Sequence, residues 1–539
     1  MSKPYFDKLG IMFDCSRNGA ATVDTLKRWI DLASSMGYNF IQLYSEDMLE
    51  LKDYPYIGHM RGRYTKEEIK ELDAYALNKG IELMPCIQTL GHLGIIFKWE
   101  QHGFLEDCDG ILLIDSDDTY KYLDHVFATC AECFTSRNIN IGMDEAFSAG
   151  LGRHLAEHGY EDRFSLLCRH LKKVNEIAEK YGFKSIMWSD LFFNFLKNEN
   201  FSGEIKMTDE LRQAIPENVG LIYWDYYVKN ENEFDKGIKN HLLFEREVYY
   251  AGAALTYTGF VPHNRFSLEA TERGIRTCIK NGVRNAMITL WGDDGKECSY
   301  FSALPSLYAF AEYAKGNFDL EKIKQGFSDL IGISFDDFML VDLPNEVDVN
   351  QVVGWNNPSK YIFYNDLFLG LFDCYTIESS AEKFKKDAMR LEKLCLHSTY
   401  GYLFKNIQAF LNVLSEKVTL GVRTRQYYLA KDKKALKKLA KREYPSLIKK
   451  IDVFYDTFKR AWDKENKPFG FELMDYRFGG IVRRIEHLKT RLLDFASGNC
   501  EKLPELEEKS LDFLGNLENY TTEQTMCTRF SRIVSPANI

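Results

Sequence analysis

The sequence has little of what marks a membrane or secreted protein. No uncharged apolar run approaches the roughly 20 residues that a transmembrane helix needs. The first ten residues, MSKPYFDKLG, lack both the apolar stretch and the small-residue cleavage site of a secretory signal. Twelve cysteines are scattered along the chain without the regular spacing of a disulfide framework. We therefore expect a cytoplasmic protein with no membrane partner.

Positive charge is also scarce. The formal net charge is −10, which argues against nucleic acids and anionic membranes as partners, because both attract clustered Lys and Arg. One basic stretch, KDKKALKKLAKR at 431–442, keeps Leu436 and Leu439 at helical spacing. This spacing favours the solvated face of a helix, and we expect no nucleic-acid partner.

Two short patterns resemble metal or redox motifs, and neither is complete. His154 and His158 have helical spacing, but the metalloprotease order needs Glu directly after the first His, and Leu155 stands there. Cys130 and Cys133 lie in a predicted amphipathic helix without a second pair. We therefore expect neither a metal ion nor another cofactor.

Short apolar runs alternate with amphipathic stretches from residue 8 to about 300, the pattern of β/α units. Eight such units predict a (β/α)8 barrel. A doubly wound sheet, the alternative, normally carries a glycine-rich phosphate turn after its first strand, where this chain reads Asp14-Cys15-Ser16-Arg17. The expected strands are Leu9–Asp14, Asn39–Tyr44, Ile81–Gln88, Ile139–Met143, Ser185–Trp188, Gly220–Trp224, Val248–Ala253 and Ala286–Trp291. The expected helices include Val23–Met36, Lys66–Asn78, Asp118–Phe134, Arg163–Tyr181 and Leu268–Asn281, several of them followed by a capping glycine.

Beyond about residue 318 long helical patterns dominate and strand signals are few. One of these segments, Ala435–Arg460, is expected to break near Pro445, because proline removes a helical hydrogen bond. We expect a catalytic barrel over residues 1–315 and an α-helical C-terminal domain over residues 316–539.

Carboxylates and aromatic residues gather at the ends of the predicted strands, where the loops of such barrels converge on one cavity. A Trp within a strand is more often core, but three at separate strand ends, each near a carboxylate, favour a sugar pocket. The strand-end residues that we assign to substrate binding are Arg17, His92, Trp188, Trp224, Asp225, Tyr250, Trp291 and Asp293. For His92 alone a structural role is an equally good interpretation.

Asp144-Glu145 is the sharpest of these features. It follows the largely apolar run Ile139-Asn140-Ile141-Gly142-Met143, where a carboxylate is costly unless pairing or function retains it. Consecutive side chains on an extended segment point to opposite sides. We therefore expect one carboxylate beneath a bound sugar and the other beside the leaving oxygen.

The sequence resembles the family 20 glycoside hydrolases, the β-N-acetylhexosaminidases, over about residues 5–310. The family's fourth strand ends in Gly-x-Asp-Glu, matched here by Gly142-Met143-Asp144-Glu145. Other matching segments are Asp14-Cys15-Ser16-Arg17, Tyr54-Pro55-Tyr56-Ile57-Gly58, Arg61-Gly62-Arg63-Tyr64-Thr65, Gly91-His92 and the three strand-end Trp residues.

The resemblance implies a retaining, substrate-assisted mechanism, an exception to the usual pair of catalytic carboxylates. The substrate's acetamido oxygen attacks the anomeric carbon, and water then opens the oxazolinium intermediate. Asp144 is expected to orient the acetamido nitrogen, and Glu145 to act as acid and then base. One of Tyr249, Tyr250 or Tyr257 is expected to hydrogen-bond the acetamido oxygen. The implied partner is a glycan or oligosaccharide that ends in a β-linked N-acetylhexosamine.

The chain departs from the family at positions that read the outer sugar hydroxyls. We expect that subsite to be rebuilt, with Asp293, Asp294 or Glu297 as replacements. The departures are Leu9 in place of Arg, Gln88 in place of an acidic residue, Asn140 in place of His, and Ala251-Gly252 where an Asp often follows Tyr.

Three functions remain open from the sequence. The first is the exo-acting hexosaminidase. The second is a barrel glycosidase in which Glu145 works with a protein nucleophile near Asp293. The third is a sugar-binding barrel without activity, which the intact pair of carboxylates disfavours.

Overall fold

The computed structural model divides by its internal contacts into two compact units. The first comprises residues 1–254, 267–291 and 306–323, and the second comprises 255–266, 292–305 and 324–539. The boundary that we predict at 315/316 therefore lies inside the last segment of the first unit. The structure describes residues 5–196, 201, 203–227, 230–347, 356–515 and 526–538.

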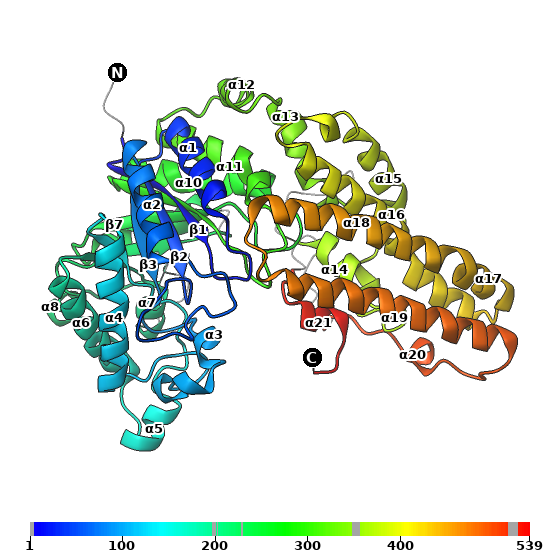
Figure 1. Ribbon diagram of the computed structural model, residues 1–539, viewed down its shortest axis with the longest axis horizontal. Coiled ribbons are helices and arrows are strands. Elements are labelled where there is room, and N and C mark those ends of the chain that lie inside the picture. The colour runs from blue at the N-terminus through cyan, green and yellow to red at the C-terminus, as the bar shows by residue number, and fades with distance from the viewer. Residues whose placement is uncertain are drawn as a thin grey trace. The chain divides into compact units, whose positions relative to one another are not determined.

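The first unit is a closed barrel of eight parallel strands in sequential order, as the sequence predicts (Figure 1). Strand β1 pairs with β2 on one side and with β8 on the other, which closes the barrel. The strands are almost entirely buried on both faces, which explains their nearly continuous apolar sequences. Their bounds are β1 Lys8–Asp14, β2 Phe40–Ser45, β3 Glu82–Ile87, β4 Asn138–Asn140, β5 Lys184–Trp188, β6 Gly220–Trp224, β7 Val248–Ala253 and β8 Asn285–Leu290.

Helices surround the strands and are defined by local capping. Helix α1 (Val23–Met36) begins at Thr22, whose side chain accepts from the Thr25 N–H, and ends at Gly37 with φ +96°. Helix α2 (Lys66–Asn78) begins with a capping box between Thr65 and Glu68. The other longer helices here are α4 Asp117–Cys133, α6 Arg163–Lys180, α9 Glu231–Leu242, α10 Asn264–Asn281 and α11 Leu304–Ala314. Shorter ones are α3 Gly94–Phe97, the 3-10 helix η1 Glu100–Leu105, α5 Arg153–His158, α7 Asp190–Phe195 and α8 Asp209–Gln213.

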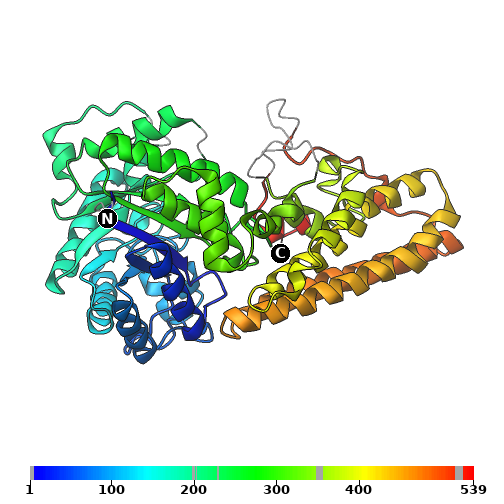
Figure 2. The same cartoon turned by 90° about the horizontal axis from the view of Figure 1, so that it is seen from above.

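The second unit is mainly helical. Its long helices α16 (Gly401–Leu429), α18 (Tyr444–Glu465) and α19 (Phe471–Ser497) pack along one another (Figure 2). Within the described ranges no helix combines the length and the apolar character needed to cross a bilayer. The remaining helices are α12 Leu320–Ile331, which begins in the first unit, α13 Phe335–Phe338, α14 Pro358–Tyr364, α15 Ser380–Arg390, α17 Lys433–Lys438, α20 Pro504–Glu507 and α21 Phe530–Val534. A π-helical turn, Leu439–Glu443, joins α17 to α18, and 3-10 turns lie at Tyr300–Ala303, Met339–Asn345, Asp373–Tyr375 and Leu394–Leu396.

Candidate active site

The segment after β4 is a strained turn. Gly142, Met143 and Glu145 have φ angles of +72°, +78° and +51°. Positive φ is unfavourable for residues with a side chain, and such strain clusters at functional sites. Strand β4 therefore ends at Asn140, before the expected Met143. Asp144 and Glu145 do not lie on an extended segment, and the expectation that they point to opposite sides is wrong.

Both carboxylates instead approach one imidazole. His92 Nε2 lies 3.2 Å from Asp144 Oδ2 and 3.4 Å from Glu145 Oε2. The Asp144 side chain is 11% exposed, whereas the Glu145 side chain is 48% exposed. The pair therefore divides into an enclosed carboxylate and a solvent-facing one, both held beside the same ring.

A hydrogen-bonded chain fixes Asp144 from the other side. Gln88 Nε2 donates to Asp144 Oδ1 at 2.7 Å and to the Tyr44 hydroxyl at 3.0 Å. Tyr44 in turn donates to Glu46 Oε1 at 3.0 Å. An amide at position 88 is suited to this place, because it donates to Asp144 without adding a third negative charge.

The environment keeps Asp144 ionised. Burial alone would raise its pKa, but the charge of His92 and the hydrogen bond from Gln88 lower the pKa below its usual value. Burial alone would lower the pKa of His92, but Asp144 and Glu145 raise it to about 11. At neutral pH the site therefore holds an imidazolium beside an ionised Asp144.

Asp190, the first residue of α7, supports the same turn from just beyond the end of β5. Its Oδ2 accepts from the Glu145 backbone N–H at 3.0 Å, and its Oδ1 accepts from Trp224 Nε1 at 3.2 Å. Burial, followed by the charge of Asp144, raises the pKa of Asp190 to about 7. Asp190 thus joins the backbone of Glu145 to a predicted wall residue.

Two predicted pocket residues, Trp188 and Trp291, meet in one aromatic group. The Trp291 ring lies 4.8 Å from Tyr44 and 5.9 Å from Trp188, centroid to centroid, and its Nε1 donates to the Tyr226 hydroxyl at 3.0 Å. The Arg17 guanidinium lies 4.7 Å and 5.0 Å from the Tyr44 and Trp291 rings. Arg17 also pairs with Asp14 at 3.1 Å and Glu46 at 3.3 Å. Arg17 and this aromatic group therefore lie next to the carboxylate chain.

Two predicted binding residues lie elsewhere. Tyr250 is fully buried, and its hydroxyl is turned toward α10. A Cβ placed on Gly274 of that helix would lie 2.1 Å from the hydroxyl. Asp225 accepts from the hydroxyl of Tyr223, whose ring packs against Gly237 of α9. Both assignments to the sugar pocket are therefore corrected: alternation along β6 and β7 turns these residues toward the helices.

The predicted residues beyond β7 and β8 belong to the second unit. Tyr257 and Asp293 lie in the segments 255–266 and 292–305, and their roles stay predictions. Asp294 and Glu297 are each bound to Lys360, both at 2.8 Å, and to Arg477. These two carboxylates already have buried cation partners, so we no longer assign them to sugar hydroxyls.

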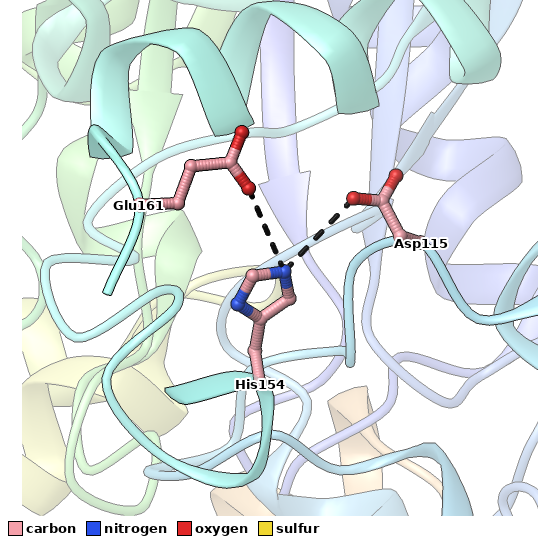
Figure 3. A group of neighbouring side chains, drawn as sticks. All are labelled: Asp115, His154 and Glu161. Atoms are coloured by element: carbon pink, nitrogen blue, oxygen red, sulfur yellow. Dashed lines mark ion pairs between the residues drawn. The ribbon is translucent and has the colours of Figure 1, made fainter. Parts of the chain in front are cut away.

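One group outside this site has metal-like spacing. His154 Nε2 lies 3.9 Å from Asp115 Oδ2 and 4.0 Å from Glu161 Oε2 (Figure 3). Arg169 donates to Glu161 at 2.6 Å and to Asp115 at 3.1 Å. Because Arg169 already supplies the positive charge, we assign this group a structural role that links α5, α6 and the residues before α4.

The site also contains four residues that the sequence does not assign to it: Tyr44, Glu46, Gln88 and Asp190. All four lie at or just beyond strand ends, which is the signal that could have identified them.

Two family models match the chain. "Glycosyl hydrolase family 20, catalytic domain" matches residues 6–239, and "Glycoside Hydrolase 20C C-terminal domain" matches residues 336–526. Together they span more than half of the sequence. The chain belongs to glycoside hydrolase family 20.

Curated relatives of this family 20 chain are about a quarter identical to it over the aligned part, which covers about a third of the chain. The β-hexosaminidase of Vibrio furnissii is 26% identical over 230 residues, which cover 35% of this chain and 38% of the relative. β-Hexosaminidase 3 of Arabidopsis thaliana is 24% identical over 36% of this chain and 39% of the relative. Hexosaminidase D of Bos taurus is 24% identical over 36% and 56%. The chain thus matches well under two thirds of each relative's length.

Solved family 20 structures are more distant. The β-N-acetylhexosaminidase from Bacteroides fragilis has a TM-score of 0.47 and 20% identity, over 61% of this chain and 71% of that one.

Proposed function

We propose that this family 20 chain is an exo-acting, retaining β-N-acetylhexosaminidase that works by substrate-assisted catalysis. The observation that carries this proposal is the division of the Asp144–Glu145 pair. One carboxylate is enclosed and kept ionised, the other faces solvent, and His92 lies within 3.4 Å of both.

The two carboxylates have different tasks in this scheme. Asp144 accepts a hydrogen bond from the substrate's acetamido N–H and stabilises the positive charge that develops as the acetamido oxygen bonds to the anomeric carbon. Glu145 gives its proton to the glycosidic oxygen as that bond to the anomeric carbon breaks. Glu145 then takes a proton from water, which attacks the anomeric carbon and opens the oxazolinium ring with overall retention.

The contacts with His92 keep the two carboxylates close together. Because both carboxylates contact the same His92 nitrogen, their facing oxygens cannot be further apart than the sum of the two contact distances. That limit lies at the lower edge of the ~6.5–9.5 Å that inverting glycosidases need to hold a water. A nucleophile supplied by the substrate needs no such space.

We assign the walls of the pocket to the aromatic residues at the strand ends. Trp224 and Trp291 offer apolar faces to a pyranose ring, the buried Trp188 packs behind Trp291, and Asp190 fixes the Trp224 indole. Arg17 donates hydrogen bonds to the outer sugar hydroxyls, because Leu9 occupies the position at which many relatives have the Arg that does so. The choice between gluco and galacto sugars is left to experiment.

The substrate comparison that tests the proposal changes only the 2-substituent. An aryl N-acetyl-β-glucosaminide and the matching aryl β-glucoside are compared by kcat/KM. We expect hydrolysis of the first to exceed that of the second by several orders of magnitude, and a thiazoline mimic of the oxazolinium to inhibit. Equal rates for the two substrates, with no inhibition by the thiazoline, would refute substrate assistance.

We also propose a glycan with a terminal β-linked N-acetylhexosamine as the partner, and a cytoplasmic location. All twelve cysteines are free. Free thiols in this number support a reducing compartment.

A further inference from the structure

A group of exposed aromatic rings lies on the barrel unit outside the catalytic site. The Tyr56 and His59 rings lie 5.4 Å and 5.5 Å from the Trp99 ring, centroid to centroid. Tyr56 is 41% exposed, His59 is exposed and Trp99 is partly exposed. We call Tyr56, His59 and Trp99 the aromatic platform.

The platform is built from two loops that start at strand ends. Tyr56 and His59 follow β2, and Trp99 follows β3. The carboxyl ends of parallel barrel strands share one face, so the platform and the catalytic residues lie on the same face of the barrel. Helix α3, in the same loop as Trp99, lies beyond the end of β3 in Figure 1.

Both loops are also anchored to the catalytic site. Trp99 follows His92 by seven residues, so even a fully extended chain would separate them by no more than about 25 Å. The loop that carries Tyr56 and His59 is held by Arg61, which donates to Asp47 at 3.1 Å and to Asn18 at 3.3 Å. Asn18 follows Arg17 directly. Both loops of the platform therefore connect directly to segments that carry residues of the proposed sugar site.

We propose that the aromatic platform binds the sugar residues that follow the terminal N-acetylhexosamine, so that the substrate is a β-linked oligosaccharide rather than a simple glycoside. This inference rests on the proposed function. It names the part of the substrate that the carboxylate pair does not contact.

The chemistry of the platform suits a saccharide. Indole and phenol rings stack on the apolar face of a pyranose, and the tilt of 42° between Tyr56 and Trp99 offers two differently oriented faces. The His59 imidazole adds a polar group that can hydrogen-bond a hydroxyl. Exposed charged residues lie close to the rings in the sequence: Lys98 and Glu100 adjoin Trp99, and Lys52 and Asp53 precede Tyr56.

The kinetic test uses two substrates with the same terminal sugar, one with further sugars after it and one with a methyl group. The kcat/KM for a β-1,4-linked N-acetylglucosamine trisaccharide is divided by the kcat/KM for methyl N-acetyl-β-glucosaminide. We expect Trp99→Ala to lower this ratio about tenfold, since stacking on one ring and the accompanying burial are worth that factor. Trp99→Phe, which keeps an aromatic face, should retain part of the ratio. Tyr476→Ala on α19, where the side chain is 79% exposed, is the matched control and should leave the ratio unchanged.

A binding measurement separates this inference from the proposed function. In a Glu145→Gln background, calorimetry compares the Kd of the trisaccharide with that of N-acetylglucosamine, with and without Trp99→Ala. Weaker trisaccharide binding in the Trp99 variant, with monosaccharide binding maintained, supports the platform. An equal loss for both sugars, or no loss for either, overturns it. If the unmutated chain cleaves the methyl glycoside and Trp99→Ala changes nothing, the platform fails while the hexosaminidase stands. If it cleaves neither substrate, the hexosaminidase itself fails.

Discussion

At the scale of single residues, the charge on His92 keeps the neighbouring Asp144 ionised. Burial lowers the pKa of His92, but the neighbouring carboxylates, Asp144 above all, raise it to about 11. We expect the imidazole to show no titration between pH 5 and 9 when followed by NMR. The Asp144→Asn variant lacks the main group that raises the pKa of His92, so the imidazole should titrate within this pH range. A wild-type midpoint near 6.5 would contradict the assignment.

Asp144→Asn also tests the proposed mechanism. The residue acts when the acetamido oxygen bonds to the anomeric carbon, a step common to all substrates. We therefore expect the variant to slow activated and unactivated glycosides alike, by about 10²–10³-fold in kcat as for other groups that stabilise developing charge. Near wild-type rates would remove Asp144 from the reaction.

Glu145→Gln should distinguish substrates by their leaving groups. A general acid matters most when the departing oxygen is a poor leaving group, and its loss typically costs about 10²–10⁴-fold. We expect that loss with oligosaccharides and a much smaller one with dinitrophenyl glycosides. Equal losses across a series of leaving-group pKa values would show that Glu145 is not the acid.

Asp190 gives the site a titration near neutral pH. Its pKa is raised to about 7, first by burial and then by the charge of Asp144. Above that pH the carboxylate accepts from both Glu145 N–H and Trp224, and below it protonation weakens this support. We expect kcat to fall as the pH drops through about 7, and Asp190→Asn to abolish this limb.

Glu46 provides the control for that pH profile. Burial raises the pKa of Glu46 to about 7 as well, despite the opposing charge of Arg17. Glu46→Gln should keep the limb. If Glu46→Gln removes it instead, the titration belongs to the Glu46–Arg17 pair.

At the scale of secondary-structure elements, Gly142 links the turn after β4 to β3. A Cβ at this position would lie 2.2 Å from Gln88 Oε1 and 2.9 Å from the Ile87 carbonyl oxygen. We expect Gly142→Ala to displace Gln88, to impair activity, and to lower the free energy of unfolding. Gly80 has the same φ of +72° with open space around it, so Gly80→Ala measures the backbone strain alone. In urea denaturation, Gly142→Ala should cost about 1–3 kcal/mol more than Gly80→Ala. An equal cost would mean that the contact with Gln88 is unimportant.

The same scale shows what the sequence could predict. Helices α1 and α2 have the predicted bounds, because Thr22, Gly37 and the Thr65–Glu68 capping box are local signals. The predicted break near Pro445 is present as the π-helical turn Leu439–Glu443, directly before the first turn of α18. The predicted strand at Ile139–Met143 extends three residues past the end of β4 at Asn140. Apolar periodicity carries no information about the positive φ angles that follow this strand.

The candidate site was predictable only in part, because several of its contacts join residues that are far apart in the sequence. Asp144-Glu145 is a contiguous motif, and the strand-end Trp residues follow from the barrel. Gln88 and Asp190 acquire their roles through partners 56 and 45 residues away. Such pairings depend on tertiary structure and not on local pattern. Tyr250 and Asp225 were misassigned because the sequence did not show which face of each strand is turned inward.

At the scale of the whole molecule, each unit has its own interior. The helical unit encloses a charged group in which Lys360 has no exposed side-chain surface and Glu297 only 1%. Lys360→Met leaves Asp294 and Glu297 with Arg477 as their remaining cation. We expect this variant to lower the free energy of unfolding by about 3–5 kcal/mol, as for other broken buried pairs.

Lys459 provides the matched control in the same unit. It pairs with Asp463 one helical turn away and is 48% exposed, so Lys459→Met should cost under about 1 kcal/mol. Calorimetry should show a lowered midpoint of thermal unfolding for Lys360→Met and not for Lys459→Met. Equal stabilities of the two variants would show that the enclosed group contributes little.

The pairing of β1 with β8 has a consequence for synthesis. Lys8 pairs with Asn285, so the first strand cannot take its final place until almost 280 further residues have been made. At the ~5–20 residues per second of a ribosome, β1 waits for tens of seconds with one edge open. During that interval the nascent chain exposes an apolar strand edge that the finished barrel hides, and it is then that we expect chaperones to engage it.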